Sequence, residues 1–535
     1  MTNDVSKVTE DSARGGFFLF SGSAIATVIM AISSILVGRF LGPELYGQYN
    51  LVLVIPTLLV LLTDFGVNVG ITKFAASLRA EGKIDRAVDL IRHGTYFKLA
   101  IGLVAAVLSV VFAGYFALII NRPDYGFFIQ IASVSVLFQV IFTTVNSAFV
   151  GLDRSEYTAL STNVQAVTKT VLQIVLVLLG FSVAGALVGY VGGFVVGSIF
   201  GVVLLFVKFL KPVRTSGAGY LGQSFKQNVT VLTRYGLPVY VAVVLIGFLP
   251  QYQQVILAFF ASDAIIGNFK AATNFVSLLT IIPASLTTAL LPAFSKLESA
   301  PDDVNGFFKR ATKYICLLIV PTTMLIILFS NQIVQLVYGS VYDLAALFLS
   351  VNALVYFLVA LGYLSVTSLF NGVGKTRLTL NMTLINFVLA LVLYPVFAQL
   401  YGVVGVIVAS FIAVLAASVY GAFVAVRRLK VNFDFKQTLR IYLAAAVSVF
   451  PSLGLLLFAP LSSLVMLAVG ALLYLFVFVT LLPLFKVVTS DELRALSKLT
   501  AGIPLLGLLV APLLKYEQKI LALINQRKKP VENTQ

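Results

Sequence analysis

The chain has 535 residues, of which 59% are hydrophobic and only 11% charged, with a mean hydropathy of +1.02. Soluble globular domains carry about 25% charged residues, so this composition excludes them and predicts a polytopic membrane protein. A single cysteine, Cys316, and a single histidine, His93, exclude a disulfide framework, a cysteine metal cluster and the usual zinc and Ser-His-Asp chemistries. No metal or other cofactor is predicted.

Apolar runs long enough to cross a bilayer follow one another along most of the chain. A crossing helix needs about 20 apolar residues, and the sequence predicts about fourteen of them. They lie near residues 16–38, 46–70, 95–120, 126–150, 158–180, 183–207, 236–259, 264–292, 311–330, 344–371, 378–397, 402–426, 439–459 and 461–485. The predicted fold class is therefore all-α integral membrane. The polar N-terminus leads into no short apolar stretch with a cleavage site, so it is not typical of a signal peptide.

Lysine and arginine residues collect on one side of this arrangement. With the N-terminus in the cytoplasm, all 37 except Arg39, Arg122 and Lys270 fall at inner loops, inner helix ends or the tails, if Lys98 and Lys169 inside helices are counted there. This asymmetry follows the positive-inside rule and predicts a plasma-membrane protein with both termini cytoplasmic. The net charge of +16 then faces anionic lipid and needs no nucleic-acid partner.

Three pairs of similar segments lie about 220 positions apart. They are residues 40–49 with 260–269, residues 149–154 with 370–375, and Gly185 with Gly405. The nearly constant offset predicts two homologous halves of six helices each. Since six is even, both halves enter the membrane from the same side and form parallel repeats, with a cavity expected between them.

The repeat gives the expected domain organisation. We predict a cytoplasmic N-terminal tail (1–15), an N-lobe (16–214), a C-lobe (215–430), two extra helices (431–487) and a cytoplasmic C-terminal tail (488–535). In that last tail the apolar run 503–514 is too short to span and is typical of an interfacial helix.

Polar residues inside the spans are candidate functional residues, because a charge at mid-bilayer costs roughly 2.5–3.5 kcal/mol. Asp64 lies well inside the second helix, with Asn68 following at helical spacing. Lys169 lies in the fifth helix, with Gln165 and Gln173 one turn to either side on the same face. Lys169 is far from both helix ends, which disfavours snorkelling.

Further polar candidates lie in helices one, seven and eight: Arg39, Gln251 and Gln254, and Lys270 with Asn274. Each candidate also has a structural interpretation. Asp64 can pair with a neighbouring cation or cap a break at Asp64-Phe65-Gly66. Arg39 and Lys270 can anchor helix ends, and glutamines and asparagines often bond one helix to another.

Several motifs together resemble one known family. They are ILVGRFLGPELYGQYN and LTDFGVNVGITKFAA around helix two, SAFVGLDRSEY between helices four and five, LFNGVGKTRLTLNMTLINFVL between ten and eleven, and the starts VAGALVG and YGVVGVIVAS of helices six and twelve. Over roughly residues 12–485 the chain resembles polysaccharide, O-antigen-type flippases of the multidrug/oligosaccharidyl-lipid/polysaccharide exporter superfamily.

The resemblance implies two six-helix lobes that flip lipid-linked sugars by alternating access. It also implies that Arg39, Asp64, Lys169 and Lys270 lie in or near a central cavity. In one respect the chain departs from the family: many relatives are expected to carry an acidic residue in helix seven, where this sequence has glutamines only. An ion-coupling carboxylate on that helix is therefore not expected.

The leading hypothesis is a secondary transporter, not an enzyme, that moves a polyprenyl-linked oligosaccharide to the outer leaflet. Ammonium and guanidinium groups suit its phosphate or pyrophosphate. The predicted substrate-binding set is Arg39, Lys169, Lys270, Gln165, Gln173, Gln251, Gln254 and Asn274, with Asp64 and Asn68 as coupling or ion-pair candidates. A polymerase or glycosyltransferase is a candidate partner.

Two alternatives stay open. A drug or organic-cation antiporter of the same superfamily needs acidic residues in the cavity, and only Asp64 is well placed for that role. A membrane-embedded glycosyltransferase or polymerase usually needs a carboxylate base or a large soluble loop, and the longest internal loops here have only about 25–30 residues.

Overall fold

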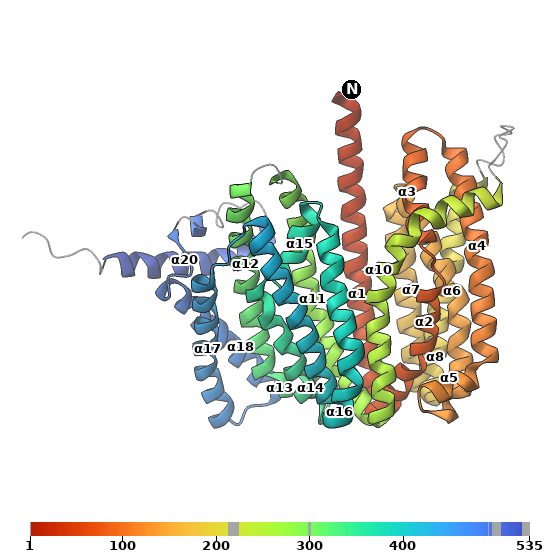
Figure 1. Ribbon diagram of the computed structural model, residues 1–535. Helices are drawn as coiled ribbons and strands as arrows, with labels where there is room; N and C mark the ends of the chain where they lie inside the picture. Colours follow the sequence, from red (N-terminus) through yellow and green to blue (C-terminus); the bar gives the residue numbers. More distant parts are fainter. Residues whose placement is uncertain (1, 212–223, 298–300, 491, 495–503, 527–535) are drawn as a thin grey trace, which may run out of the picture. The chain divides into compact units, whose positions relative to one another are not determined.

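The structure, a computed structural model, describes residues 2–211, 224–297, 301–490, 492–494 and 504–526 (Figure 1). The described residues contain helices and no strand. The first part forms α1 (Thr2–Val52), α2 (Val54–Leu62), α3 (Val67–Ala80), α4 (Ile84–Val111), α5 (Ala113–Ile119), η1 (Pro123–Tyr125), α6 (Gly126–Gly151), α7 (Ser155–Leu176), η2 (Val177–Phe181), α8 (Ser182–Leu205) and η3 (Phe206–Leu210). The remainder forms α10 (Phe225–Phe260), α11 (Asp263–Leu297), α12 (Pro301–Leu328), α13 (Ser330–Val337), α14 (Ala345–Ala353), η4 (Leu354–Leu361), α15 (Ser365–Gly372), α16 (Thr376–Leu429), α17 (Phe435–Phe458), α18 (Ser463–Leu484) and α20 (Pro504–Gln526).

Among the described residues, nine helices are long and apolar enough to cross a membrane, or ten with the bent pair formed by α14–η4 and α15. Three of them, Ser21–Leu62, Ser155–Leu210 and Thr376–Leu429, have 42, 56 and 54 residues. At about 1.5 Å per residue, each is roughly twice as long as the hydrocarbon core is thick. Each also contains a non-helical glycine at which the chain can turn, namely Gly42, Gly180 and Gly402. Two passes for each of these, together with the bent pair and the 35-residue α11, confirm the prediction of about fourteen spans.

The backbone repeats at the offset found in the sequence. Ser182 has φ 49° and ψ −133°, and Gly402, 220 positions later, has φ 57° and ψ −137°. The turn after α6 is closed by Leu152 N–H to Ala148 O, Asp153 N–H to Val150 O and Arg154 N–H to Phe149 O. At an offset of 221, the turn after α15 is closed by Val373 N–H to Leu369 O, Gly374 N–H to Asn371 O and Lys375 N–H to Phe370 O. The segments that match in sequence therefore also fold alike.

The chain forms two compact units. The first comprises Met1–Asn274, Val341–Leu344 and Phe387–Ala409, and the second comprises Phe275–Ser340, Ala345–Asn386 and Ser410–Gln535. Every candidate site residue named above belongs to the first unit. The lobe boundary expected at 214/215 lies outside the described residues.

Both ends of the chain contain more helix than we predicted. Residues 2–15, expected to form a tail, continue α1 as helix. At the other end the apolar run expected from residue 503 belongs to the 23-residue α20, which packs against α18. Leu514 is buried in the core of the second unit, and the Tyr516 hydroxyl lies 3.1 Å from Thr480 Oγ1.

Glu517 is a buried polar residue of α20, with only 6% of its surface exposed. Burial raises the pKa of its carboxyl from the ordinary 4.5 to about 7. The packed helix therefore holds a proton on this group over a pH range in which a detached helix has lost it.

The raised pKa predicts that α20 packs most firmly at low pH. Packing weakens as the pH rises from about 4.5 through about 7, because the carboxylate then has to be buried with its charge. Hydrogen exchange of the α20 amides at pH 5.5 and pH 8 should be faster at the higher pH, after correction for intrinsic rates. Glu517→Gln should remove the difference, and an unchanged difference in that variant would contradict the assignment.

Candidate functional site

The second membrane pass is broken where the sequence allowed a break, between α2 and α3. Phe65 and Gly66 both have positive φ, 48° and 75°. Gly66 meets Gly236 of α10 so closely that a Cβ built on Gly66 would lie 2.1 Å from the Gly236 carbonyl carbon. Glycine is therefore needed on both sides of this crossing, at Gly66 for its backbone angle as well as for space.

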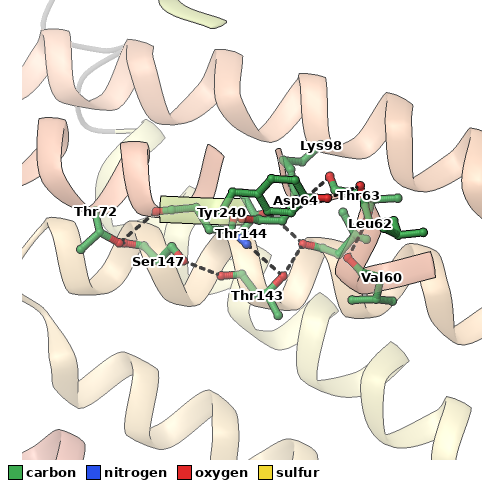
Figure 2. Close-up of polar contacts among 12 residues, drawn as sticks. Val60, Leu62, Thr63, Asp64, Thr72, Lys98, Thr143, Thr144, Ser147 and Tyr240 are labelled. Atoms are coloured by element: carbon green, nitrogen blue, oxygen red, sulfur yellow. Dashed lines mark hydrogen bonds and ion pairs between the residues drawn. The ribbon is translucent and has the colours of Figure 1, made fainter. Parts of the chain in front are cut away.

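The polar groups freed by the break have partners from two other helices (Figure 2). Lys98 Nζ of α4 lies 3.0 Å from Asp64 Oδ1 and donates a second hydrogen bond, also 3.0 Å, to the Thr63 carbonyl. The Tyr240 hydroxyl of α10 donates to the Leu62 carbonyl at 2.9 Å. The Lys98 side chain is 2% exposed and that of Asp64 is 21% exposed. Asp64 is thus the ion-paired residue of a helix break.

Asn68 follows this break on α3 and contacts Thr143 of α6. Its Nδ2 lies 3.4 Å from Thr143 Oγ1, while its buried Oδ1 has no hydrogen-bond partner among the described residues. One turn later, Thr72 donates to the Asn68 and Ser147 carbonyls. The face of α3 that contacts α6 is therefore polar, and among the described residues its Asn68 Oδ1 lacks a hydrogen-bond partner.

The polar stripe of α7 lies against a stripe of glycines on α8. Built Cβ atoms on Gly189, Gly193 and Gly197 would lie 2.5 Å from Gln173 N, 2.5 Å from Lys169 Cβ and 2.6 Å from Gln165 Cβ, respectively. Small residues let helix backbones approach closely in membranes. The glycines thus let α8 lie directly against the helix face that carries the three predicted residues.

Gln173, at the C-terminal end of that stripe, is fully engaged within the protein. Its Nε2 donates to the Tyr49 hydroxyl at 2.8 Å and to the Ala186 carbonyl at 2.9 Å, and its Oε1 accepts from Ser33 Oγ at 3.0 Å. It joins α7 to α8 and to both passes of α1. Gln165, 3% exposed, makes no side-chain hydrogen bond within the described residues.

Lys169 lies between these two glutamines, and its environment contains no counter-charge. Its Nζ is 5.1 Å from the centre of the Tyr190 ring of α8, a cation–π distance. The other charge close to it is Lys270 of α11, which repels it. Neither ammonium group has a carboxylate within ion-pair distance in the described part of the chain. The structure therefore places two like charges from different repeats near each other.

The remaining predicted residues lie around this pair in different settings. Asn274, one turn after Lys270, donates from Nδ2 to Ser34 Oγ at 2.9 Å and to the Tyr46 hydroxyl at 2.8 Å. Arg39 is exposed on α1 shortly before the Gly42 turn. Gln251 and Gln254 are half-buried on α10, and Gln254 Oε1 is buried without a partner among the described residues.

Sequence reasoning missed three residues that define this geometry: Lys98, Tyr190 and Tyr240. Lys98 had been counted with the inner charges, although it stands in the predicted third span. The sequence did contain a signal for this pair: Asp64 and Lys98 carry opposite charges and lie inside consecutive predicted spans, the second and the third. Tyrosines are too frequent in this chain, at 22, to be singled out by type.

The fold and site define a class: a helical membrane transporter built from two repeats, with uncompensated cationic groups inside its spans. The sequence profile of the polysaccharide biosynthesis protein family matches residues 12–298, and the chain belongs to that family. This confirms the predicted membership of the exporter superfamily.

Individual relatives agree with this assignment. The lipid II flippase MurJ of Bacillus subtilis is 24% identical over 78% of this chain and 82% of its own. The Haloferax volcanii protein named "Probable low-salt glycan biosynthesis flippase Agl15" is 21% identical over 91% of this chain and 99% of its own.

Solved structures share the fold at low identity. A lipid II flippase MurJ in an inward closed conformation matches with a TM-score of 0.68 and 17% identity, over 86% of this chain and 97% of its own. An inward-facing multidrug resistance MATE family transporter matches with a TM-score of 0.64 and 17% identity, over 76% and 94%. At this identity the likeness establishes the fold alone.

Removing one partner of the Asp64–Lys98 pair leaves a buried charge without compensation. We predict that Lys98→Met alone costs about 3–5 kcal/mol of stability, measured as unfolding in detergent. The double variant with Asp64→Asn should recover most of that loss. Arg154→Ala, which breaks an exposed pair with Glu156, is the matched control and should cost less than about 1 kcal/mol. A double variant as unstable as Lys98→Met would contradict a specific pair.

The α7–α8 contact predicts a second sensitivity. Gly193→Ala puts a methyl group 2.5 Å from Lys169 Cβ and 2.9 Å from its Cα, so α7 and α8 must separate, at a cost of about 1–3 kcal/mol. Gly114→Ala is the control, because nothing lies within 4 Å of its Cβ position. Equal thermal unfolding of the two variants would show that α8 does not press on α7 at this point.

Proposed function

We propose that this protein is a secondary transporter that flips a polyprenyl-linked oligosaccharide, carried on phosphate or pyrophosphate, from the cytoplasmic to the outer leaflet. It would act by alternating access in the assembly of a cell-surface polysaccharide or glycan. Family membership supports lipid-linked glycan flipping as the general activity. The observation that carries the proposal for this chain is the pair of uncompensated ammonium groups of Lys169 and Lys270.

The two lysines suit the head group of such a lipid. Two like charges held near each other without a counter-ion lower their mutual repulsion when an anion binds between or beside them. A phosphate or pyrophosphate supplies this charge together with several hydrogen-bond acceptors. In this proposal Arg39 contributes a further cation nearer the outer surface.

Uncharged polar groups would contact the sugar. The Oε1 of Gln254 has no partner within the described protein, and Gln165 makes no side-chain hydrogen bond there, so both amides are suited to hydroxyl groups of a glycan. Gln251 has the same chemistry on α10. Asn274 is already bonded to Ser34 and Tyr46, so in this proposal it holds Lys270's helix against α1.

The orientation follows from charge. Since nearly all basic residues fall on one side, we propose that both termini are cytoplasmic. The N-lobe (16–214) and C-lobe (215–430) would be the moving halves. A polymerase or glycosyltransferase that extends the exposed glycan is the proposed partner class.

The structural likeness to a MATE transporter favours a second candidate, a multidrug or organic-cation antiporter. A cation exchanger needs a carboxylate that can exchange its partner. Asp64 is the only acidic residue within the predicted spans, and it is held by Lys98. Efflux of a cationic dye that is lost in Asp64→Asn, in cells that do not depend on a glycan, would favour this candidate.

The flippase proposal predicts that Lys169→Ala and Lys270→Ala lose flipping while inserting normally in the membrane. Purified protein in liposomes with a labelled lipid-pyrophosphate oligosaccharide would be assayed by exposure of the sugar to an external lectin. Lys169→Arg should keep partial activity, because charge is retained. Lys430→Ala, outside the spans, is the matched control. Wild-type exposure rates in both alanine variants would remove the lysines from the mechanism.

A further inference from the structure

The second pass of the first repeat, which begins after Gly42, crosses α11, the second pass of the second repeat. They cross at equivalent glycines. A Cβ on Gly47 would lie 1.9 Å from the Asp263 carbonyl oxygen, and a Cβ on Gly267 would lie 1.9 Å from the Pro43 carbonyl oxygen. At the repeat offset of 220, Gly47 corresponds to Gly267 and Pro43 corresponds to Asp263, so the two contacts are equivalent. The contact is therefore reciprocal, like that across a two-fold axis. It lies at the ends of these helices away from the amino terminus of α1, within the first compact unit.

A half-buried arginine closes one side of this crossing. Arg122, in the loop after α5, donates from Nε to Asp263 Oδ1 at 2.8 Å, from Nη2 to the Ala261 carbonyl at 2.9 Å and from Nη1 to the Ala258 carbonyl at 2.9 Å. The Tyr125 hydroxyl donates to the other carboxylate oxygen of Asp263. The side chains of Arg122 and Asp263 are only 20% and 13% exposed. The loop between the third and fourth passes is thus tied to the junction of α10 and α11.

A tyrosine closes the other side in the equivalent way. The Tyr342 hydroxyl donates to the Gly38 carbonyl at 2.6 Å. Tyr342 corresponds to Arg122 at the offset of 220, and Gly38 corresponds to Ala258. In each repeat, therefore, the loop between its third and fourth passes donates a hydrogen bond to the end of the first pass of the other repeat. One of these contacts is ionic and the other is neutral.

We propose that these two contacts are a pair of latches that keep the protein closed on the side away from its amino terminus. Opening to that side requires the Gly47–Gly267 crossing to part, and it cannot part while Arg122 and Tyr342 each hold the opposite repeat. The ionic latch is the stronger of the two, because Arg122 makes a charge-assisted hydrogen bond to Asp263 and two more to backbone carbonyls, whereas Tyr342 makes one neutral hydrogen bond to Gly38. The inference rests on the proposed function only in assuming that the protein alternates between two openings and that its amino terminus is cytoplasmic.

The experiment measures closure directly and needs no glycan. In a Cys316→Ser background, Lys270→Cys places a reporter thiol on α11, one turn past the crossing. Labelling by a membrane-impermeant maleimide is followed in right-side-out vesicles. Because a charge-assisted hydrogen bond is lost, Asp263→Asn should speed labelling about tenfold. Tyr342→Phe should speed it less, and the double variant should exceed both.

Matched controls remove a group of the same kind from the same surface. Asp124→Asn removes an exposed carboxylate two residues after Arg122, and Tyr401→Phe removes an exposed hydroxyl. Neither should change labelling. Unchanged rates in Asp263→Asn and Tyr342→Phe, or an equal increase in Asp124→Asn, would overturn the latches. If Asp263→Asn does not fold, Tyr342→Phe, which loses one oxygen atom, decides alone.

The result separates the latches from the proposed function. Faster labelling in the latch variants, with no glycan exposed by the wild-type protein in liposomes, would keep the latches and reject the substrate. Glycan flipping with unchanged labelling would keep the substrate and reject the latches.

Discussion

The structure depends on one constraint: inside a bilayer, backbone groups freed by a helix break must find partners within the protein. The break at Thr63–Gly66 meets it with side chains from two other helices, since Lys98 serves Thr63 and Tyr240 serves Leu62. Lys98 could not remain buried without a counter-charge, and Asp64 provides it. The intramembrane carboxylate is therefore explained by the break before any transport role is considered.

The same constraint acts on helix packing. A polar stripe inside a membrane protein needs hydrogen-bond partners close to it. The glycines of α8 bring the α8 backbone against the polar stripe of α7. Gln173 then reaches the Ala186 carbonyl, Tyr49 and Ser33 at once. Lys169, on the same stripe, finds an aromatic face in place of a carboxylate. Two residues that the sequence offered on equal terms thus differ in the structure: Gln173 has its hydrogen bonds within the protein, whereas Lys169 has no carboxylate partner in the described part of the chain.

Patterns that repeat along the chain could be predicted from the sequence, and pairings across it could not. Spans follow from runs of apolar residues, and the offset of 220 correctly marked turns that share dihedral angles and hydrogen bonds. Asp64-Phe65-Gly66 marked the break. That Lys98 is the partner of Asp64, and that Gln173 is satisfied while Gln165 is not, depends on which helix faces touch. Hydropathy does not encode this, because each face contains similar apolar residues.

The two repeats keep the same turn geometry but differ in the residues that close the side away from the amino terminus. Turn geometry is kept at Ser182 and Gly402, although serine at positive φ is strained and glycine is not. The residues that close the far side are not kept: an arginine in one repeat corresponds to a tyrosine in the other, and Asp263 corresponds to Pro43. A second ionic contact in place of the neutral one would stabilise the closed form further, whereas one ionic and one neutral contact leave the two forms closer in free energy. A transporter that visits both forms in each cycle needs that balance, so the loss of symmetry at this point is itself consistent with a moving protein.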